Sequence, residues 1–231
     1  MLIWSYKIKY SMKKKIALVG ASGFVGSKLL IELTNRGYHV LAIARNIKDI
    51  EKLPNVECKA IDVNHLDSLT KGFQGCDAVI SAFSPSRNDQ NDQRIYEDYL
   101  NGAQHIQEAT HKAGIKRYIF VGGSGSLYVN NVQLVDHDDF PSEIKPLALA
   151  GREYLSNLKI EKNLDWTYFS PAIEMNPRTS GERRGKFKTK EKSPVYDDSL
   201  RSLLSVEDAA AAIVDELENN KYIRKQFTAG Y

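Results

Sequence analysis

From residue 16 onward, short runs of apolar and β-branched residues alternate with amphipathic stretches. We expect six of these runs to form strands, at residues 16–20, 39–44, 56–61, 77–83, 117–123 and 165–170. Their hydrophobicity is continuous rather than alternating, which is typical of parallel strands that helices cover on both faces. The pattern therefore predicts an α/β fold, with a doubly wound parallel sheet and helices on both of its faces.

Three stretches between the runs carry apolar residues at helical spacing, at 24–36, 94–113 and 146–162. The first two are followed by Gly37 and Gly114, and glycine commonly occupies the position just after a helix. The third begins with a proline in its first turn, where the missing N–H costs nothing. We therefore expect helices over all three stretches.

Two segments do not follow the alternation. The loops 84–93 and 125–145 follow the fourth and fifth strands, on the carboxyl edge where open α/β sheets bind ligands. Residues 174–204 are expected to form a small C-terminal lobe on the substrate side. After that lobe, Ser205 with Asp208 three residues later predicts the capped start of a last helix.

Length and composition fit a single domain over residues 1–231. A chain of 231 residues with 42% hydrophobic residues can bury a core without disulfides or metals. Met12 precedes three lysines and is the more natural chain start, so we expect residues 1–11 to be an extension of the domain. Lysines at the alternate positions 186, 188, 190 and 192 indicate an extended segment with one basic face.

Charge and cysteine content exclude several classes of partner. The formal charge of +3 is too small for nucleic acid or an anionic membrane to be the main partner. No run reaches the roughly 20 apolar residues of a membrane helix. Cys58 and Cys76 form no Cys-x-x-Cys, which predicts free thiols in a reducing, cytoplasmic setting. The five histidines lack metal-ligand spacing, so we expect no metal site.

A glycine-rich motif occupies the turn between the first strand and the first helix. In it, Gly20 permits a tight turn, Gly23 lets the backbone approach a pyrophosphate, and Gly26 lets helix and strand pack closely. The free N–H groups at such a helix start and the helix dipole favour phosphate. An ordinary glycine turn is the alternative. The cofactor-binding residues predicted here are Gly20, Ser22, Gly23, Phe24, Val25 and Gly26.

The end of the second strand indicates which cofactor is preferred. A dinucleotide fold that binds NAD places a carboxylate there, whereas this chain has Arg45. A guanidinium pairs with a 2′-phosphate, so NADP(H) is predicted in preference to NAD(H), although an arginine here can also be a simple surface residue. Asp62 and Val63 are expected beside the adenine, and Ala82 with Phe83 beside the rest of the nucleotide.

These motifs belong to a wider resemblance that extends from Met12 to Tyr231. The chain resembles the NmrA-like, atypical branch of the short-chain dehydrogenase/reductase superfamily, in particular bacterial proteins described as NADH-flavin reductases or as NAD-dependent epimerase/dehydratase proteins. The resemblance implies a Rossmann fold, a nicotinamide cofactor and a redox or sensing role. It rests on the segments KKKIALVGASGFVGSKLLIELTNRGYHVLAIARN, KAIDVNHLDSL, DAVISAFSP, RYIFVGGSGSL, LDWTYFSPA and FTAGY.

The superfamily's catalytic residues are a serine and a Tyr-x-x-x-Lys pair, and this chain departs from that pattern. In the predicted helix 146–162, Tyr154 and Lys159 are five residues apart and do not share a helix face. The resemblance leaves Ser124 as the candidate catalytic residue, or as part of a glycine-rich turn that gives the cofactor room. By the same analogy, Pro171 and Ile173 are expected at the nicotinamide end.

A site without a dedicated acid suits an acceptor that needs little help with protons, such as a flavin. The leading hypothesis is therefore an NADPH-preferring oxidoreductase of flavin-reductase type. Phe83, Tyr128 and Phe140 are candidates to cover a planar acceptor. The alternatives are a non-catalytic NAD(P)-binding redox sensor and a sugar-nucleotide epimerase or dehydratase. We expect a small-molecule acceptor as the partner and a monomer or homodimer.

Overall fold

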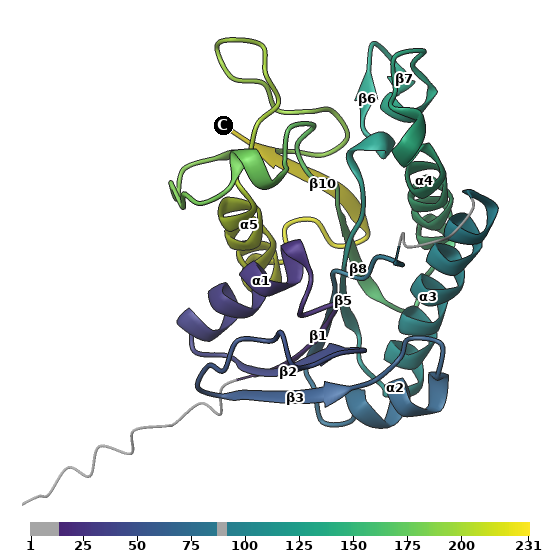
Figure 1. Ribbon diagram of the computed structural model, residues 1–231, viewed down its shortest axis with the longest axis vertical. Helices are drawn as coiled ribbons and strands as arrows, with labels where there is room; N and C mark the ends of the chain where they lie inside the picture. Colours follow the sequence, from purple (N-terminus) through teal and green to yellow (C-terminus); the bar gives the residue numbers. More distant parts are fainter. Residues whose placement is uncertain (1–13, 87–91) are drawn as a thin grey trace, which may run out of the picture.

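The computed structural model describes residues 14–86 and 92–231 (Figure 1). The predicted extension 1–11 lies outside these residues, as do residues 87–91 of the predicted loop 84–93. Within the described ranges, no helix is long and apolar enough to cross a membrane.

An eight-stranded sheet in the order β3-β2-β1-β4-β5-β8-β10-β9 forms the centre of the molecule. All neighbouring strands pair in parallel except β10 and β9, which pair antiparallel. The six predicted strands are present with ends shifted by at most two residues. The strands are β1 (Lys15–Val19), β2 (His39–Ala44), β3 (Val56–Ala60), β4 (Ala78–Ser81), β5 (Arg117–Val121), β8 (Asp165–Phe169), β9 (Lys188–Lys190) and β10 (Lys225–Gly230).

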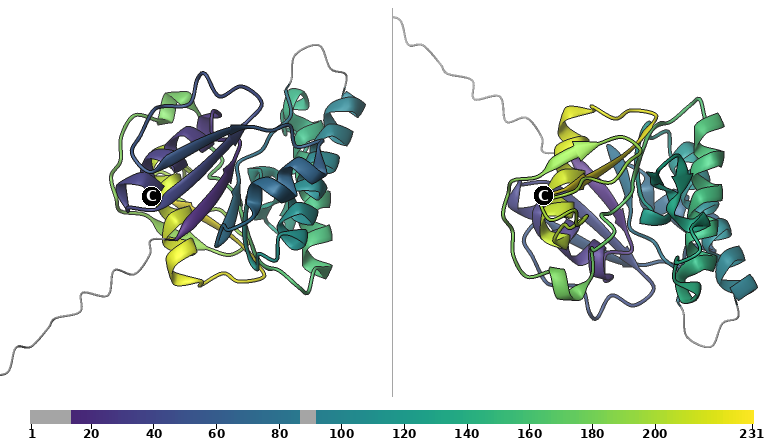
Figure 2. Two further views of the ribbon diagram at one scale, coloured as in Figure 1. Left: turned by 90° about the horizontal axis from the view of Figure 1, so that it is seen from below. Right: turned by 90° about the horizontal axis from the view of Figure 1, so that it is seen from above.

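Helices cover both faces of the sheet, so the doubly wound α/β fold is confirmed (Figures 1 and 2). On one face lie α1 (Phe24–Asn35) and α5 (Val206–Asn219), and on the other lie α2 (Leu66–Phe73), α3 (Asp92–Lys112) and α4 (Lys145–Ile160). The Ser205 side chain accepts a hydrogen bond from the backbone N–H of Asp208, as predicted for a helix cap. Gly37 and Gly114 both have positive φ after their helices.

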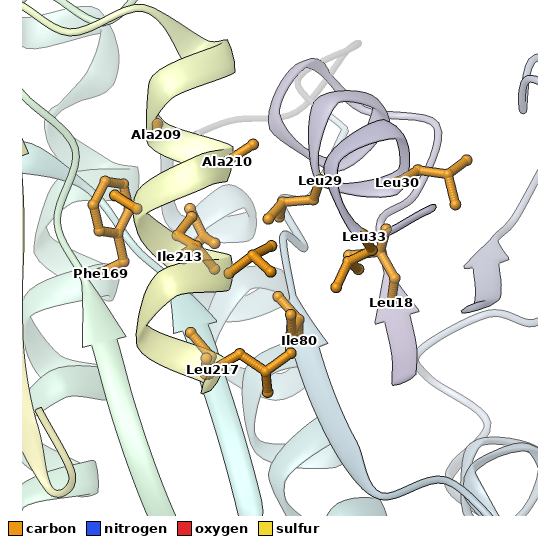
Figure 3. Close-up of a cluster of buried hydrophobic side chains, with 14 of the residues drawn as sticks. Leu18, Leu29, Leu30, Leu33, Ile80, Phe169, Ala209, Ala210, Ile213 and Leu217 are labelled. Carbon is orange, nitrogen blue, oxygen red and sulfur yellow. The ribbon is translucent and has the colours of Figure 1, made fainter. Parts of the chain in front are cut away.

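The core is divided by the sheet into two apolar layers. On the α1/α5 face, Leu29 and Leu33 of α1 meet Ile213 of α5 above Leu18 and Ile80 of the strands, all of them fully buried (Figure 3). Successive strand residues point to opposite faces, so Ala17 and Val19 belong to the other layer. This explains why the strand sequences are continuously hydrophobic.

Three features of the structure depart from the predictions. The sheet is not wholly parallel, because the predicted basic extended segment supplies β9, which pairs antiparallel with β10. The segment 125–145 is not a plain loop. It contains the hairpin β6 (Tyr128–Val129) with β7 (Val132–Gln133) and the short 3-10 helices η2 (Leu134–Asp136) and η3 (Ser142–Ile144), with η1 (Ser124–Ser126) at its start. The elements α2 and β10 were not predicted.

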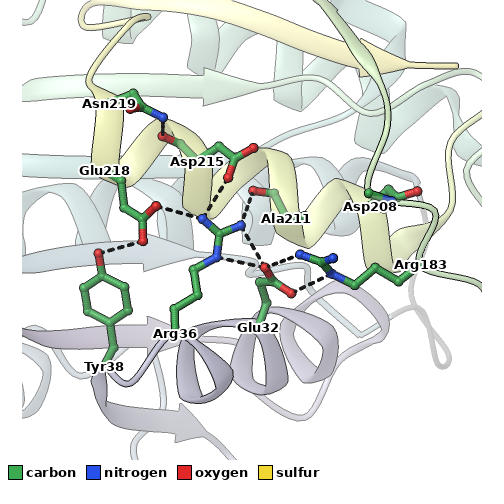
Figure 4. A network of polar contacts seen from close by, with 10 residues as sticks. Glu32, Arg36, Tyr38, Arg183, Asp208, Ala211, Asp215, Glu218 and Asn219 are labelled. Atoms are coloured by element: carbon green, nitrogen blue, oxygen red, sulfur yellow. Dashed lines mark hydrogen bonds and ion pairs between the residues drawn. The ribbon is translucent and has the colours of Figure 1, made fainter.

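The segment 174–204 lies at the carboxyl edge and is anchored to both helices of one face (Figure 4). It includes η4 (Pro177–Thr179) and β9. Glu32 of α1 accepts hydrogen bonds from Arg183 Nε (3.0 Å) and Nη2 (2.8 Å) and from Arg36 Nε (2.8 Å). The buried Asp208 carboxylate of α5 accepts the backbone N–H groups of Arg184 (3.0 Å) and Gly185 (2.8 Å).

Candidate functional site

A cavity of about 420 Å³ lies at the carboxyl ends of β1, β2, β4 and β5. It opens on the edge of the sheet where ligands bind in folds of this type. The lining includes ten of the fourteen predicted site residues: Gly20, Ser22, Gly23, Phe24, Val25, Arg45, Val63, Ala82, Phe83 and Ser124. Gly26, Asp62, Pro171 and Ile173 are not among the lining residues.

The turn between β1 and α1 forms one wall, and its glycines fit the cradle of a phosphate. Gly20 has φ +79°, and a Cβ there would lie 2.6 Å from the Ala82 carbonyl oxygen. A Cβ on Gly26 would lie 2.0 Å from the Gly20 carbonyl oxygen, so Gly26 is needed for packing although it does not line the cavity. In the described part of the chain, the N–H groups of Ser22, Phe24 and Val25 have no backbone acceptor. They are therefore available to an anion at the start of α1.

Arg45 lies where β2 ends, and it is exposed. It is the one charged residue among the described residues that line the cavity, and within the described ranges its guanidinium forms no ion pair. Its neighbour Ala44 provides no carboxylate. This wall therefore offers a free cation and no anion.

The next part of the wall is apolar and includes residues that the sequence did not single out. Ile43, Ile61 and Tyr99 line it beside Val63 and Phe83. The Phe83 ring lies where a side chain at Gly102 would be, with a Cβ there 2.4 Å from the ring. Tyr99 is one of the buried residues of α3, like Ala103 and Ile106, and helical spacing alone cannot distinguish a core position from one at the rim of a cavity.

Asp62 does not line this wall. Its carboxylate accepts a hydrogen bond from the backbone N–H of Asn64 (2.9 Å), which closes a local turn. The Val63 carbonyl lies 3.1 Å from His105 Nδ1, so the segment after β3 is fastened to α3.

The far end of the cavity is lined by glycines and apolar side chains with one serine. It is formed by the turn after β5 and the start of α4, with Ser124 as its hydroxyl group. The lining residues here are Val121, Gly122, Gly123, Ser124, Gly125, Phe140, Ile144, Leu147 and Ala148.

The Tyr168 ring of β8 packs directly against the turn at this end of the cavity. A Cβ on Gly122 would lie 1.9 Å from the Tyr168 hydroxyl, and this hydroxyl donates to the Gly151 carbonyl of α4 (3.0 Å). The glycine at 122 thus lets the turn lie directly on the Tyr168 ring.

Tyr154 of α4 is fully buried and does not line the cavity. Its hydroxyl lies 3.0 Å from that of Tyr118 and donates to Gln107 Oε1 (3.0 Å). Burial, with the neighbouring Tyr118, raises the pKa of Tyr154 well above its usual 10. Tyr154 is therefore a neutral core residue.

The predicted residues after β8 lie outside the cavity. The Ile173 backbone N–H donates to Ser202 Oγ (3.3 Å), and its side chain is 43% exposed. Ser170 is buried in a network with Ser126 and Gln226. Of the aromatic residues proposed to cover an acceptor, Phe83 and Phe140 line the cavity, whereas Tyr128 is in the hairpin and donates its N–H to the Lys192 carbonyl.

Residues 14–86 and 92–231 contain no group of three or more His, Cys, Asp or Glu side chains that could hold a metal ion. Cys58 is exposed and Cys76 buried, and both are free thiols.

The strand order 3-2-1-4-5, the glycine turn and the cavity beside it define a Rossmann-type nucleotide-binding protein. Residues 20–220 match the NAD(P)H-binding family, and the chain belongs to that family. Its structural neighbours include a protein described as an epimerase and one described as an NADH-flavin reductase, descriptions of the two kinds that the sequence resemblance implied.

Three relatives cover nearly the whole chain. The uncharacterized protein YwnB of Bacillus subtilis is 30% identical over 93% of this chain and 97% of its own. A Bacteroides thetaiotaomicron protein, provisionally described as an epimerase, is 40% identical with a TM-score of 0.86, covering 95% of this chain and 97% of that one. A Streptococcus pneumoniae protein, provisionally described as an NADH-flavin reductase, is 29% identical with a TM-score of 0.80, covering 94% and 99%. The chain spans only 36% to 61% of the longer plant reductases that it also matches.

Proposed function

We propose that this protein is an NADPH-preferring oxidoreductase that reduces a flavin or a similar planar acceptor. The observation that carries the proposal is the contrast between the two ends of the cavity. One end has free N–H groups and the cation Arg45, whereas the other is lined, among the described residues, mainly by glycines and apolar side chains together with the Ser124 hydroxyl. A flat aromatic acceptor matches such an end better than a sugar does, because sugar hydroxyls need many hydrogen-bond partners.

The chain has groups suited to each part of the cofactor. Ser22, Phe24 and Val25 would bind the pyrophosphate through their N–H groups, and Arg45 would pair with a 2′-phosphate. Val63 and Phe83 would pack against the adenine half. The turn 122–125 would lie beside the nicotinamide, where Gly122 and Gly123 leave room for a ring.

A bound NADPH supplies a hydride, which is two electrons and a proton. The apolar wall of Phe140, Ile144 and Leu147 would orient the acceptor ring and exclude water from it. Reduction of a flavin also needs one proton, which solvent can deliver to the ring. A protonated side chain beside the acceptor ring is therefore not required. We infer a reducing, cytoplasmic setting, in keeping with the free thiols of Cys58 and Cys76.

The direct test is oxidation of NADPH by the purified protein, followed optically with and without flavin, with NADH run in parallel. We expect flavin-dependent turnover that prefers NADPH. No turnover with any flavin or quinone would refute the proposed function.

Ser124→Ala tests the hydroxyl at the apolar end. If the hydroxyl contacts the reacting groups, we expect kcat to fall by roughly tenfold or more, the size of one lost hydrogen bond to a developing charge. Ser27→Ala, at an exposed hydroxyl of α1, is the control. Unchanged kcat in Ser124→Ala would mean that the hydroxyl does not contact the reacting groups and that Ser124 is only part of a glycine-rich turn.

The burial of Tyr154 away from the cavity favours a second candidate, a redox sensor that binds NAD(P) without turnover. Such a protein should bind NADPH and NADP⁺ with clearly different affinities. Isothermal titration with both forms distinguishes it from the reductase. The same burial weakens the epimerase or dehydratase alternative, which needs a tyrosine acid at the nicotinamide end.

A further inference from the structure

Gly102 lies near the middle of α3, where an ordinary helix has no need of a glycine. The helix runs without interruption from Asp92 to Lys112, and Gly102 is one of its buried residues. Glycine disfavours a helix interior relative to alanine, because it loses more conformational freedom on folding. The reason for a glycine here therefore lies in what a side chain would contact.

That contact is the ring of Phe83. A Cβ on Gly102 would lie 2.4 Å from Cε1 and 2.4 Å from Cζ of this ring, and 3.2 Å from Val63 Cγ2. Atoms in folded proteins do not approach one another to 2.4 Å, so the ring occupies the space of a side chain on α3. Phe83 and Val63 line the first cavity, whereas Gly102 is not among its lining residues. The ring thus has the cavity on one side and α3 on the other.

Neighbouring residues hold α3 in place behind the ring. His105 Nδ1, one turn after Gly102, lies 3.1 Å from the Val63 carbonyl oxygen. The Tyr99 ring, one turn before Gly102, has its centroid 6.4 Å from that of Phe83 and limits movement of the ring along the helix. A side chain at position 102 would therefore displace the Phe83 ring toward the cavity, which is the open side.

The adjacent helix repeats this arrangement in a weaker form. Gly72 of α2 is buried, and a Cβ there would lie 2.9 Å from Ile61 Cδ1. Ile61 also lines the cavity. Its Cδ1 is the end of a flexible side chain and can turn aside, which the ring of Phe83 cannot do as easily. Both helices therefore have a glycine directly behind the same part of the cavity wall.

We propose that Gly102 is a positioning residue that sets the depth of the cavity where the adenine of the cofactor binds, because it lets the Phe83 ring lie back against α3. The inference rests on the proposed function in one respect, the placement of the adenine half beside Val63 and Phe83. A purine is a flat ring whose binding depends on close packing with apolar and aromatic side chains. Gly102→Ala would move the Phe83 ring into the space that the purine needs.

The experiment measures Kd for NADPH, NADH and ADP by equilibrium titration. The proteins compared are the natural one, Gly102→Ala, Phe83→Leu and the double variant. ADP is the part that both cofactors contain, so the result does not depend on which cofactor is preferred. We expect Gly102→Ala to weaken binding of all three ligands by roughly tenfold or more, the usual size of an overpacking effect. Leucine has no Cε1 or Cζ, so Gly102→Ala should leave the Kd unchanged in the Phe83→Leu background.

Asn101→Ala, at the exposed position before Gly102, is the matched control. It also raises the helix propensity of α3, and every Kd should stay unchanged. Unchanged Kd values in Gly102→Ala would overturn the proposal, as would an equal loss in Asn101→Ala. A loss that persists in the Phe83→Leu background would mean that α3 itself moves, and a loss for NADPH and NADH without one for ADP would place Phe83 away from the adenine. Failure of Gly102→Ala to fold would also overturn the proposal, which requires room for the ring on the cavity side.

These measurements need no turnover, so they separate this inference from the proposed reductase activity. If no flavin is reduced but the Kd values change as expected, the proposed activity fails and the role of Gly102 stands. If flavin is reduced and Gly102→Ala binds all three ligands normally, only the role of Gly102 fails. A natural protein that binds none of the three ligands would contradict both.

Discussion

Gly23 and Gly26 belong to the same motif, but the structure requires them for different reasons. A Cβ on Gly23 would meet only the Gly20 carbonyl oxygen, at 3.3 Å, and Gly23 has negative φ. A Cβ on Gly26 would lie 2.0 Å from that same oxygen. The first glycine leaves space for a ligand, and the second lets α1 start directly beside the turn.

We therefore predict that Gly23→Val folds but loses NADPH binding, because its side chain fills the space beside the phosphate donors. Gly26→Val should lower the free energy of unfolding by about 1–3 kcal/mol or more, because the clash is with backbone. Fluorescence titration with NADPH and thermal unfolding separate the two effects. If Gly23→Val binds NADPH as tightly as the natural protein, the phosphate does not bind beside Gly23.

Arg45→Asp should exchange the cofactor preference. The free guanidinium that can pair with a 2′-phosphate is replaced by a carboxylate that repels it and accepts hydrogen bonds from a 2′-hydroxyl. The ratio of the Kd for NADH to the Kd for NADPH should fall by roughly tenfold or more. Equilibrium titration measures this ratio with or without turnover. An unchanged ratio would show that Arg45 does not select the cofactor.

Tyr154→Phe should reduce stability and leave turnover intact. Loss of its hydroxyl removes one hydrogen-bond partner from the buried Tyr118 hydroxyl and the donor to Gln107 Oε1, which should cost about 1–2 kcal/mol in the free energy of unfolding. Urea denaturation and kcat are the measurements. A loss of kcat without a loss of stability would make Tyr154 the missing acid, contrary to its position.

At this scale the sequence predicts the cavity lining beside the glycine turn better than the lining beside α4. The glycine turn and Arg45 are close together along the chain and beside strand ends, so local patterns locate them. Ile144, Leu147 and Ala148 reach the cavity only because α4 packs against the turn after β5, and an apolar residue has no sequence mark for that role. Pro171 and Ile173 were assigned by analogy, and the hydrogen bond from Ile173 to Ser202 directs that segment toward the lobe.

At the scale of the elements, Glu32 links the helix that follows the glycine turn to the C-terminal lobe. Burial alone would raise the pKa of the Glu32 carboxyl, but the hydrogen bonds and positive charges of Arg183 and Arg36 together lower it below its usual 4.5 (Figure 4). The ionised carboxylate therefore stabilises the folded state at neutral pH. This stabilisation is lost as pH falls through the lowered pKa.

We expect Glu32→Gln to be less stable than the natural protein by about 2 kcal/mol at neutral pH, because hydrogen bonds to charged groups are lost. The difference should shrink as pH falls below the usual 4.5, since protonation removes the same charge from the natural protein. Urea denaturation of both proteins at neutral and acidic pH tests this. A difference in the free energy of unfolding that is independent of pH would mean that the charge of Glu32 contributes nothing to stability.

Among the elements, those with long hydrophobic runs or clear caps were predictable, and the exceptions have physical reasons. The helix α2 has only eight residues, too short to show more than two turns of its pattern. The strand β9 lies in the predicted extended segment, but its pairing with the unpredicted β10 was not foreseen, because β9 has exposed lysines at both ends and is held by that pairing rather than by burial. Its partner is far along the chain, and single-sequence patterns do not reveal which distant segments pair.

At the scale of the whole molecule, the sheet ends in two charged edges. Glu57 and Lys59 are on β3, where they form an ion pair, and Lys188 and Lys190 are on β9. Charged side chains on outer strands discourage edge-to-edge association between copies. Any homodimer should therefore use a helix face or the lobe rather than extend the sheet.

The last helix and strand also have a consequence for how the protein is made. Leu29 and Leu33 of α1 are covered by α5, and β10 lies between β8 and β9, so residues 206–230 complete a core to which α1 already contributes. At the usual 5 to 20 residues per second, translation of the chain takes roughly 10 to 50 seconds. For most of that time the nascent chain exposes the apolar side of α1. A ribosome stalled before Val206 would thus display a natural target for chaperones, because α5 and β10 are still missing from the core.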